Sequence, residues 1–357
     1  MDTSEPMTGD SGPAMARTVP WKQLLGYALA GASLVWVFHD THVERMFGHI
    51  GSMSWWWVLP AVACDVFGYV CDGARWRYLL LPVGRLSVWR ATQAIYIGLF
   101  TNEVTPMRFG EVVRTYLASR WMGRPIAEVV PSMLVIRLLD GAWMAIGIGL
   151  VAIFVPLPRN LVLAGDIFGA AVLLLVGGFL ILVLGEPQLV THWARQPSAK
   201  AGLAAWVKRA VGGVLQGLQQ IGARGTLAVA GAFSLGFLAF QVLAFWLIME
   251  AYHLQLPLSV GAVVYLIVHF GTALPNAPAN VGSYQFFTVL GLSLFGIEKT
   301  QATGFSVVVF IILTLPLWAL GLAALSRTGM TLATIRADIR SSMRSGERAS
   351  PIPGGGE

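Results

Sequence analysis

One segment of this sequence combines residue types that could bind an anion with a break in the hydrophobic pattern. Residues 102–114, with the sequence NEVTPMRFGEVVR, carry four charged side chains within an otherwise apolar region. Arg108, Glu111 and Arg114 are spaced three apart, so that neighbours can pair along one face of a helix. A guanidinium group can bind a phosphate through two parallel hydrogen bonds, and a helix N-terminus adds a positive dipole end. The segment therefore predicts a phosphate-binding site, with a neutralised ion-pair network as the alternative.

The break recurs, with fewer charges, in the second half of the chain. Pro106 stands four residues before Gly110, and Pro278 stands four residues before Gly282. A helix is expected after each glycine, and the dipeptide Thr105-Pro106 also favours a helix start through an N-cap and a proline in the first turn. Two interrupted hydrophobic segments at matching places in two halves of a chain indicate the binding site of a membrane transporter.

Other polar residues inside apolar stretches are candidates for the same site. Asn102, Asn280 and Gln285 lie beside the two breaks, where each could hydrogen-bond a ligand. For Asn280 the alternative is to cap the second helix, and for Gln285 it is a packing contact. Arg137 and Asp140 are three residues apart on one face of a predicted helix. They either bind the ligand or form an ion pair that holds the first break against that helix.

Two further ionisable residues are candidates for coupling transport to protons. His269 titrates near neutral pH when it is unperturbed, and Asp65 lies within an apolar stretch where a charge is costly. For each of them the alternative is an ordinary hydrogen bond to a neighbouring helix.

The composition is that of an integral membrane protein. Hydrophobic residues make up 56% of the 357 residues and charged residues only 12%, and the mean hydropathy is +0.68. A bilayer core about 30 Å thick requires roughly 20 apolar residues per helix. Six stretches are expected to be transmembrane helices: 23–39, 53–71, 129–155, 161–184, 226–250 and 303–325.

The lysines and arginines divide unevenly between the two predicted sides of the membrane. One side receives most of them, including Arg75 just beyond the second predicted span, whereas the other side receives only Arg45, Arg159 and Lys299. By the positive-inside rule the crowded side is the cytoplasm. We therefore expect both termini in the cytoplasm. Because topology accounts for the net charge of +6, no nucleic-acid partner is expected.

The predicted topology indicates that each break lies in a re-entrant hairpin and that the two hairpins enter the membrane from opposite sides. Residues 91–120 lie between cytoplasmic arginines, so this hairpin enters from the cytoplasm, whereas residues 258–297 enter from outside. The expected fold is all-α, with about six transmembrane helices and two re-entrant helical hairpins in an inverted repeat. The expected parts are a disordered cytoplasmic tail (1–20), a first membrane half (21–185), an amphipathic cytoplasmic connector (186–225), a second membrane half (226–326) and a second disordered cytoplasmic tail (327–357).

The sequence holds no pattern typical of an enzyme or of a metal site. It contains no P-loop, no His-Glu-x-x-His element, no Cys/His cluster with zinc-site spacing and no nucleophile elbow. We therefore expect neither enzymatic activity nor a cofactor or metal ion.

The residues around the two breaks resemble those of a known family. They are Asn102, Pro106, Gly110, Glu111 and Arg114, then Arg137 and Asp140, then Pro275, Pro278 and Gly282. Over residues 20–326 they are similar to the flippase-like transmembrane region of the lysylphosphatidylglycerol synthases, although the usual Pro-Gly-Gly of the second break is Pro-Ala-Asn here. The resemblance implies a protein of the bacterial inner membrane that moves aminoacylated, other anionic or isoprenoid-linked lipids between leaflets. Fused family members add a soluble aminoacyl-transferase domain, and only a short tail follows Leu325, so lysyl-lipid synthesis is not expected.

The function expected from these observations is that of a lipid flippase. Arg108 and Arg114 would hold the phosphate of the lipid headgroup, Glu111 and Asp140 would orient these arginines, and the amides beside the breaks would supply hydrogen bonds. Two alternatives stay open: a secondary transporter of a small solute or ion, and a non-transporting scaffold for lipid-modifying enzymes. Whether the protein forms a homodimer also stays open.

Overall fold

Helices make up the regular structure of the described chain. The computed structural model describes residues 21–105, 109–154, 159–184, 225–273 and 278–345, and these ranges contain α-helices and two short 3-10 helices. In chain order they are α1 (Trp21–Phe38), α2 (Val43–Gly51), η1 (Trp55–Trp57), α3 (Val58–Leu80), α4 (Val88–Val104), α5 (Gly110–Met122), α6 (Ile126–Phe154), α7 (Arg159–Leu184), α10 (Thr226–Ala251), α11 (Leu258–Ala273), η2 (Pro278–Asn280), α12 (Ser283–Ser293), α13 (Lys299–Arg327) and α14 (Leu332–Ser345).

Each of the six predicted spans overlaps a helix, namely α1, α3, α6, α7, α10 and α13. Among the residues that the structure describes, four stretches are long and apolar enough to cross a membrane: Trp55–Leu80, Ile126–Leu150, Thr226–Ala251 and Lys299–Arg327. Shorter apolar stretches lie in α1, α7 and α11. The length and composition of these helices are those of an α-helical membrane protein.

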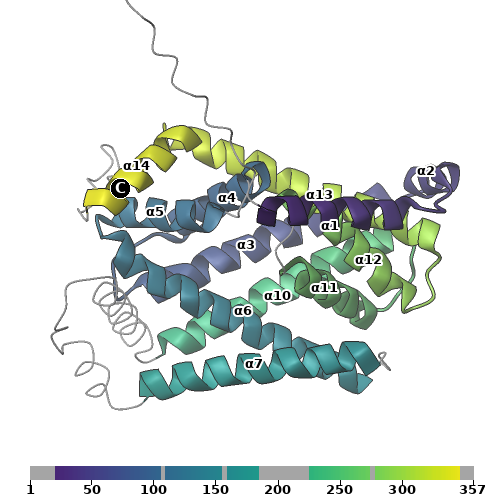
Figure 1. The fold of residues 1–357 in the computed structure, drawn as a ribbon, viewed down its shortest axis with the longest axis horizontal. Coiled ribbons are helices and arrows are strands. Elements are labelled where there is room, and N and C mark those ends of the chain that lie inside the picture. Colours follow the sequence, from purple (N-terminus) through teal and green to yellow (C-terminus); the bar gives the residue numbers. More distant parts are fainter. Residues whose placement is uncertain (1–20, 106–108, 155–158, 185–224, 274–277, 346–357) are drawn as a thin grey trace, which may run out of the picture.

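The centre of the molecule is formed by α3 and α10, which pack against each other along much of their length (Figure 1). Small residues permit this close packing, as is common between membrane helices. A Cβ on Gly68 of α3 would stand 3.0 Å from Nε2 of Gln241 on α10. A Cβ on Gly73 would stand only 2.1 Å from the hydroxyl of Thr92, so the same helix also holds α4 closely.

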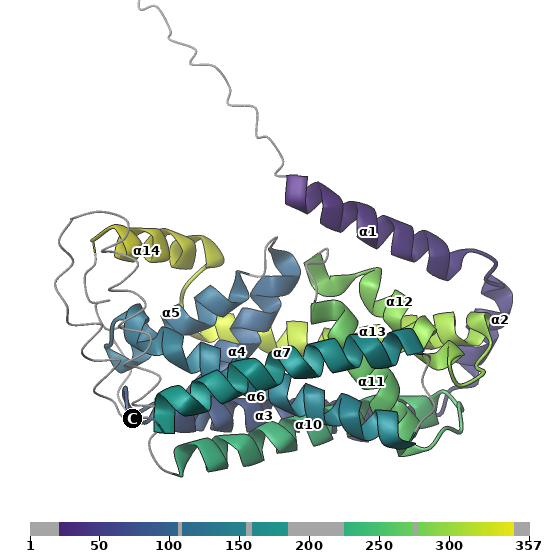
Figure 2. The same cartoon turned by 60° about the horizontal axis from the view of Figure 1, so that its bottom comes forward.

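Two helical hairpins flank this central pair at opposite ends of the long axis. Helices α4 and α5 lie toward one end, and α11 and α12 lie toward the other, in both views (Figures 1 and 2). Each hairpin packs its two helices against each other, and η2, in the turn of the second hairpin, contacts α4 of the first. The two hairpins therefore meet near the middle of the molecule.

The packing of the first set of helices is repeated in the second. The pairs α3–α4, α5–α6 and α4–α13 correspond to α10–α11, α12–α13 and α11–α6, and all of these pairs are in contact. Each helix from α3 to α6 thus has a counterpart from α10 to α13 with equivalent neighbours.

The C-terminal region differs from the expected disordered tail. Residues of α14 form a helix whose Ile335 and Ile339 are buried in the same apolar core as Leu117 of α5. The hydroxyl of Tyr116 donates to Oδ2 of Asp338 over 2.8 Å. The prediction missed this helix because its apolar residues are few and are spaced to cover a neighbour rather than to span a membrane. The other predicted tail (1–20), residues 186–224 of the connector and residues 346–357 lie outside the described residues.

Candidate functional site

The returning helix of the first hairpin begins at Gly110. The predicted N-cap, Thr105, instead ends α4: its backbone is extended, and its hydroxyl donates to the carbonyl one turn earlier over 2.6 Å. The N–H of Gly110 donates to Oδ1 of Asn102 over 2.8 Å. Asn102 therefore caps the start of α5, a structural role that was not predicted for it. Arg108, a predicted phosphate ligand, lies outside the described residues.

Two glycines bring the backbones of α4 and α5 into contact. A Cβ on Gly110 would lie 1.8 Å from the carbonyl oxygen of Gly98, and a Cβ on Gly98 would lie 2.8 Å from the carbonyl oxygen of Gly110. Such distances leave no room for any side chain, because the obstructing atoms belong to the backbone. This contact fixes where the first turns of α5 lie along α4. It therefore also fixes the position of Arg114.

Arg114 is a buried cation at this hairpin. The residue is 9% exposed, and its Cζ lies 5.6 Å from the centroid of the Trp76 ring. The indole N–H of Trp76 is itself fixed, because it donates to the hydroxyl of Ser132 over 2.9 Å. Within the described part of the chain, Arg114 forms no ion pair and its buried Nε has no hydrogen-bond partner. A buried guanidinium in this state has hydrogen-bonding capacity left for a ligand.

A second buried arginine links three helices next to this site. Arg75 of α3 is 1% exposed, and its Nε donates to Oδ1 of Asp72 over 3.0 Å. Its Nη1 donates to the hydroxyl of Ser234 on α10 over 3.1 Å and to the carboxylate of Asp140 on α6. Its Cζ lies 5.6 Å from the ring of Phe237. Arg75 therefore has its charge balanced by two carboxylates, unlike Arg114.

The structure corrects the predicted location of Arg75. The second span was expected to end at residue 71, which placed Arg75 in the cytoplasm, but α3 continues to Leu80 and Arg75 lies inside the helix bundle. The spacing of Asp72 and Arg75, three apart on one helix, could have indicated their ion pair. The other two partners lie on α6 and α10, and nothing in the local sequence points to them.

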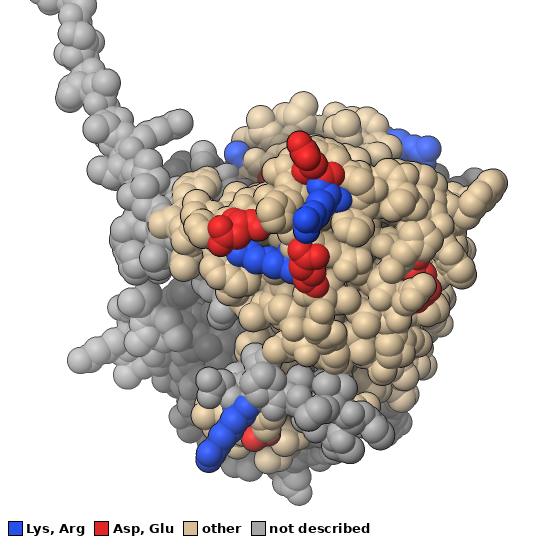
Figure 3. All heavy atoms as spheres, turned by 90° about the vertical axis from the view of Figure 1, so that its right-hand side faces the viewer, with Lys and Arg blue, Asp and Glu red and all other residues tan. Residues whose placement is uncertain are grey.

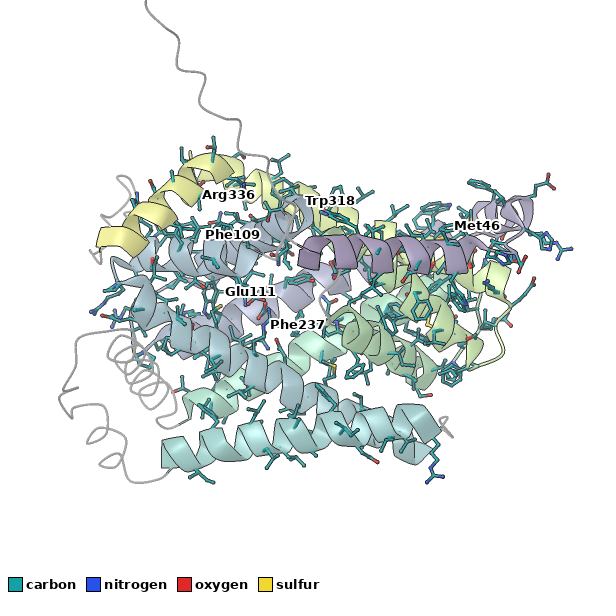
Figure 4. All side chains as sticks on the ribbon, in the orientation of Figure 1. Met46, Phe109, Glu111, Phe237, Trp318 and Arg336 are labelled. Atoms are coloured by element: carbon teal, nitrogen blue, oxygen red, sulfur yellow. The ribbon has the colours of Figure 1, made fainter. Side chains whose placement is uncertain are left out.

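Glu111 and Arg137 extend the ion pairs of Arg75 toward the surface. Together with Asp72, Arg75 and Asp140 they form an arginine network. An ion pair joins Glu111 of α5 to Arg137 of α6, and Nη1 of Arg137 lies 3.8 Å from Oδ2 of Asp140. The Arg137–Asp140 ion pair, one of the two predicted alternatives for these residues, is therefore present. Of the two partners predicted for Glu111, Arg114 forms no ion pair with it and Arg108 lies outside the described residues. The side chains of Glu111, Arg137 and Asp140 are 37%, 54% and 27% exposed, against 2% for Arg75. The network thus runs from an exposed pair to a buried one, with Glu111 and Phe237 both in the central region of Figure 4.

The second hairpin has the same kind of helix start but a different chemistry. Its α12 follows Gly282, which has a φ of +87°, and the N–H of Gly282 donates to Oε1 of Gln285 over 2.8 Å. Gln285 is 5% exposed, so its carbonyl serves the cap. Asn280 also has a positive φ, +54°, and lies in η2, the turn that contacts α4.

The two predicted proton-coupling residues lie in different surroundings. His269 is exposed near the end of α11, where it stacks on Tyr265 with the ring centroids 5.2 Å apart. Asp65 is 1% exposed on α3, and Nε2 of Gln241 donates to its Oδ1 over 3.0 Å. The structure therefore places only Asp65 inside the central helix pair.

Comparison with known proteins identifies the family. The family described as Lysylphosphatidylglycerol synthase TM region matches residues 23–321, which include both hairpins and the whole arginine network. The chain belongs to this family. None of the curated proteins compared with the chain matches it. Membership makes the chain a membrane protein linked to lipid metabolism or transport.

Proposed function

We propose that the protein is a transporter, rather than an enzyme, that moves a phosphate-bearing lipid between the leaflets of the bacterial inner membrane. The lipid is an anionic phospholipid or an isoprenoid-linked lipid. The observation that carries this proposal is Arg114, a buried guanidinium without an ion pair among the described residues, at the hairpin of a lysylphosphatidylglycerol synthase-type membrane region.

The energetics favour an anionic ligand at Arg114. A buried charge costs several kcal/mol unless it is paired and hydrogen-bonded. The ring of Trp76 supplies a cation–π contact worth roughly 0.5–2 kcal/mol, which offsets only part of that cost. A phosphate can accept two parallel hydrogen bonds from one guanidinium and neutralise its charge. Binding of a lipid phosphate would therefore complete the site.

The arginine network supplies a contact that can open when α5 moves. The Glu111–Arg137 pair bridges α5 to α6 and is largely exposed, so breaking it costs about 1 kcal/mol or less. The pairs of Arg75 with Asp72 and Asp140 are much more buried and stay fixed. In the proposed mechanism α5 moves against a rigid frame made by α3, α6 and α10, and Arg114 moves with it.

The matched packing of the two helix sets supports an inverted repeat as the framework for this movement. Helices α3 to α6 and α10 to α13 have equivalent neighbours, and the hairpins lie toward opposite ends of the long axis (Figure 2). In transporters built from inverted repeats, substrate sites lie near the bilayer midplane and one half moves against the other. The first hairpin would enter from the cytoplasm and the second from outside, with both termini cytoplasmic.

The proposal is tested by leaflet-resolved translocation in proteoliposomes. Arg114→Gln is compared with wild type and with Arg124→Gln, which changes an exposed arginine in the α5–α6 turn. Loss of charged hydrogen bonds worth about 1.5–3 kcal/mol should slow translocation of a lipid phosphate roughly 10- to 100-fold. Arg124→Gln should leave the rate unchanged.

Two results would count against the proposal in different ways. Equal rates for wild type and Arg114→Gln would show that the headgroup binds elsewhere. A wild-type protein that translocates none of the anionic phospholipids or isoprenoid-linked phosphates supplied would rule out the flippase function itself.

A further inference from the structure

Asp65 is a buried carboxyl group whose hydrogen-bonding capacity is half used. Its Oδ1 accepts from Nε2 of Gln241 over 3.0 Å, and the same amide nitrogen lies 3.4 Å from the backbone carbonyl of Asp65. Its Oδ2 is buried and has no hydrogen-bond partner among the described residues. The described part of the chain also places no lysine, arginine or histidine in an ion pair with Asp65, although Arg75 of the same helix is paired twice.

Four tyrosines, one on α3 and three on the hairpin helices, have hydroxyls that interact electrostatically with this carboxyl group. The hydroxyls of Tyr69 on α3, Tyr96 on α4, Tyr265 on α11 and Tyr284 on α12 all lie within range of its charge. The rings of Tyr69 and Tyr96 stand 5.6 Å apart. The hydroxyl of Tyr96 is a second buried oxygen without a partner among the described residues. The charge of Asp65 therefore interacts with tyrosines on one helix of the first hairpin and on both helices of the second.

The other ionisable groups nearby do not neutralise it. On α3, the neighbouring Cys64 is not a basic residue, and Asp72 is paired with Arg75. Helix α10 contributes the neutral amide of Gln241. His269 of α11 stacks on Tyr265 and is exposed.

Two further helices that pack on α3, α6 and α13, supply no ion pair to Asp65 among the described residues. On α6, Arg137 and Asp140 belong to the arginine network, in which each has its own partners. Helix α13 has no ionisable side chain between Lys299 and Arg327 at its two ends.

The residues around Asp65 favour binding of a proton rather than a metal cation to its carboxyl group. An ionised, unpaired carboxylate at this depth would cost several kcal/mol, whereas the neutral acid avoids that cost. Hard cations such as Ca²⁺ and Mg²⁺ require about six oxygen ligands. Here one carboxyl oxygen is already occupied by an N–H donor, which repels a cation. A single proton on Oδ2 satisfies the group without further ligands.

We propose that Asp65 binds and releases the proton that couples lipid movement to the proton gradient. This inference rests on the proposed lipid-transport function. With both hairpins packed as described, the carboxyl group holds its proton. When the hairpin helices that bear Tyr96, Tyr265 and Tyr284 move, water reaches the group, the O–H bond breaks and the proton leaves to water on one side. Reprotonation from the other side resets the carrier.

Protonation is measured directly, without lipid transport. Infrared difference spectra of the purified full-length protein, titrated from acid to alkaline pH, should show loss of the C=O stretch of a buried protonated carboxyl. Asp65→Asn should lack this band, whereas Asp166→Asn, which changes an exposed carboxyl on α7, should keep it. Gln241→Leu should shift the band, because it removes the hydrogen bond to Oδ1. A spectrum of Asp65→Asn or Gln241→Leu identical to that of wild type would overturn the assignment.

Coupling is measured in proteoliposomes with an imposed pH gradient. With one proton per lipid, a gradient of one pH unit should give about tenfold lipid accumulation in wild type. Asp65→Asn should exchange lipid without accumulating it. Exchange that ignores the pH gradient, or that follows a sodium gradient, would overturn the proton coupling and leave the proposed function standing. Absence of all exchange, with the infrared band present, would overturn the proposed function and the coupling with it.

Discussion

Arg75 balances the charge of two carboxylates, Asp72 and Asp140. The side chain of Asp72 is 7% exposed and that of Asp140 is 27% exposed, and both pair with the same guanidinium. A buried ion pair contributes little relative to an apolar replacement of the whole set, but removal of one member leaves an uncompensated charge. The network is therefore more important for holding α3, α6 and α10 in one arrangement than for net stability.

Removal of Arg75 should be strongly destabilising. We expect Arg75→Met to reduce the free energy of unfolding by about 3–5 kcal/mol, since the buried Asp72 would be left unpaired and Asp140 would keep only its contact with Arg137. Unfolding of the detergent-solubilised protein by denaturant measures the change, with Arg85→Met, at an exposed position, as the control. The double variant Arg75→Met with Asp72→Leu should recover part of the loss. If Arg75→Met unfolded like the control, the network would have no structural role.

At the residue level, the sequence indicates chemistry better than it indicates partners. Glu111, Arg137 and Asp140 were recognised because charges in apolar sequence are costly. Glu111 nevertheless pairs with Arg137 on the next helix rather than with Arg114 on its own, because the direction of a side chain depends on tertiary packing. Asn102 and Gln285 were predicted as candidate ligands, and both accept hydrogen bonds from glycine N–H groups at or just before a helix start.

At the scale of the elements, the first hairpin depends on backbone contact between α4 and α5. Apart from that contact, the C-terminal helix α14 lies over α5, and Cζ of Arg336 stands 5.6 Å from the Phe109 ring at the helix start (Figure 4). The hairpin is thus held by a glycine pair on one side and by α14 on the other. A change at the glycine pair acts on the position of Arg114 without touching a charged group.

Gly110→Ala should disrupt this hairpin. Its Cβ would lie 1.8 Å from the backbone oxygen of Gly98, which cannot rotate away. Overpacking typically costs 1–3 kcal/mol, and we expect a loss of unfolding free energy at or above about 3 kcal/mol here. Gly149→Ala is the matched control, because a Cβ on that glycine of α6 would meet no atom within 4 Å. Equal stability of the two variants would show that α4 and α5 do not pack at these glycines.

The elements themselves follow from the sequence where the hydrophobic pattern is long. The six expected spans each overlap a helix because roughly 20 apolar residues in succession have few other stable arrangements. A helix after Gly110 was predicted, but its cap and the helix α14 were missed, since each depends on a contact outside its own segment: the amide of Asn102 for the start of α5 and the apolar face of α5 for α14. Short elements are determined by such contacts more than by their own pattern.

At the scale of the whole molecule, the two ends differ in charge. Figure 3 faces the end that carries α2 and the start of α13, where a few basic and acidic side chains stand together on a mostly uncharged face. Glu44, Arg45, Glu298 and Lys299 belong to this end. The opposite end holds the connections before α4 and after α5, which carry arginines such as Arg85 and Arg124. This asymmetry supports the proposed orientation, with the arginine-rich end in the cytoplasm.

Accessible cysteines placed at the two ends test that orientation. In a background without Cys64 and Cys71, Arg85→Cys and Arg124→Cys flank the first hairpin, and Gln255→Cys and Glu298→Cys flank the second. A membrane-impermeant maleimide should label the second pair in intact spheroplasts and the first pair only in inside-out vesicles. Labelling of all four from one side would exclude an inverted repeat. The reverse pattern would keep the repeat but turn the molecule over, so that the buried Arg114 would belong to a hairpin that enters from outside.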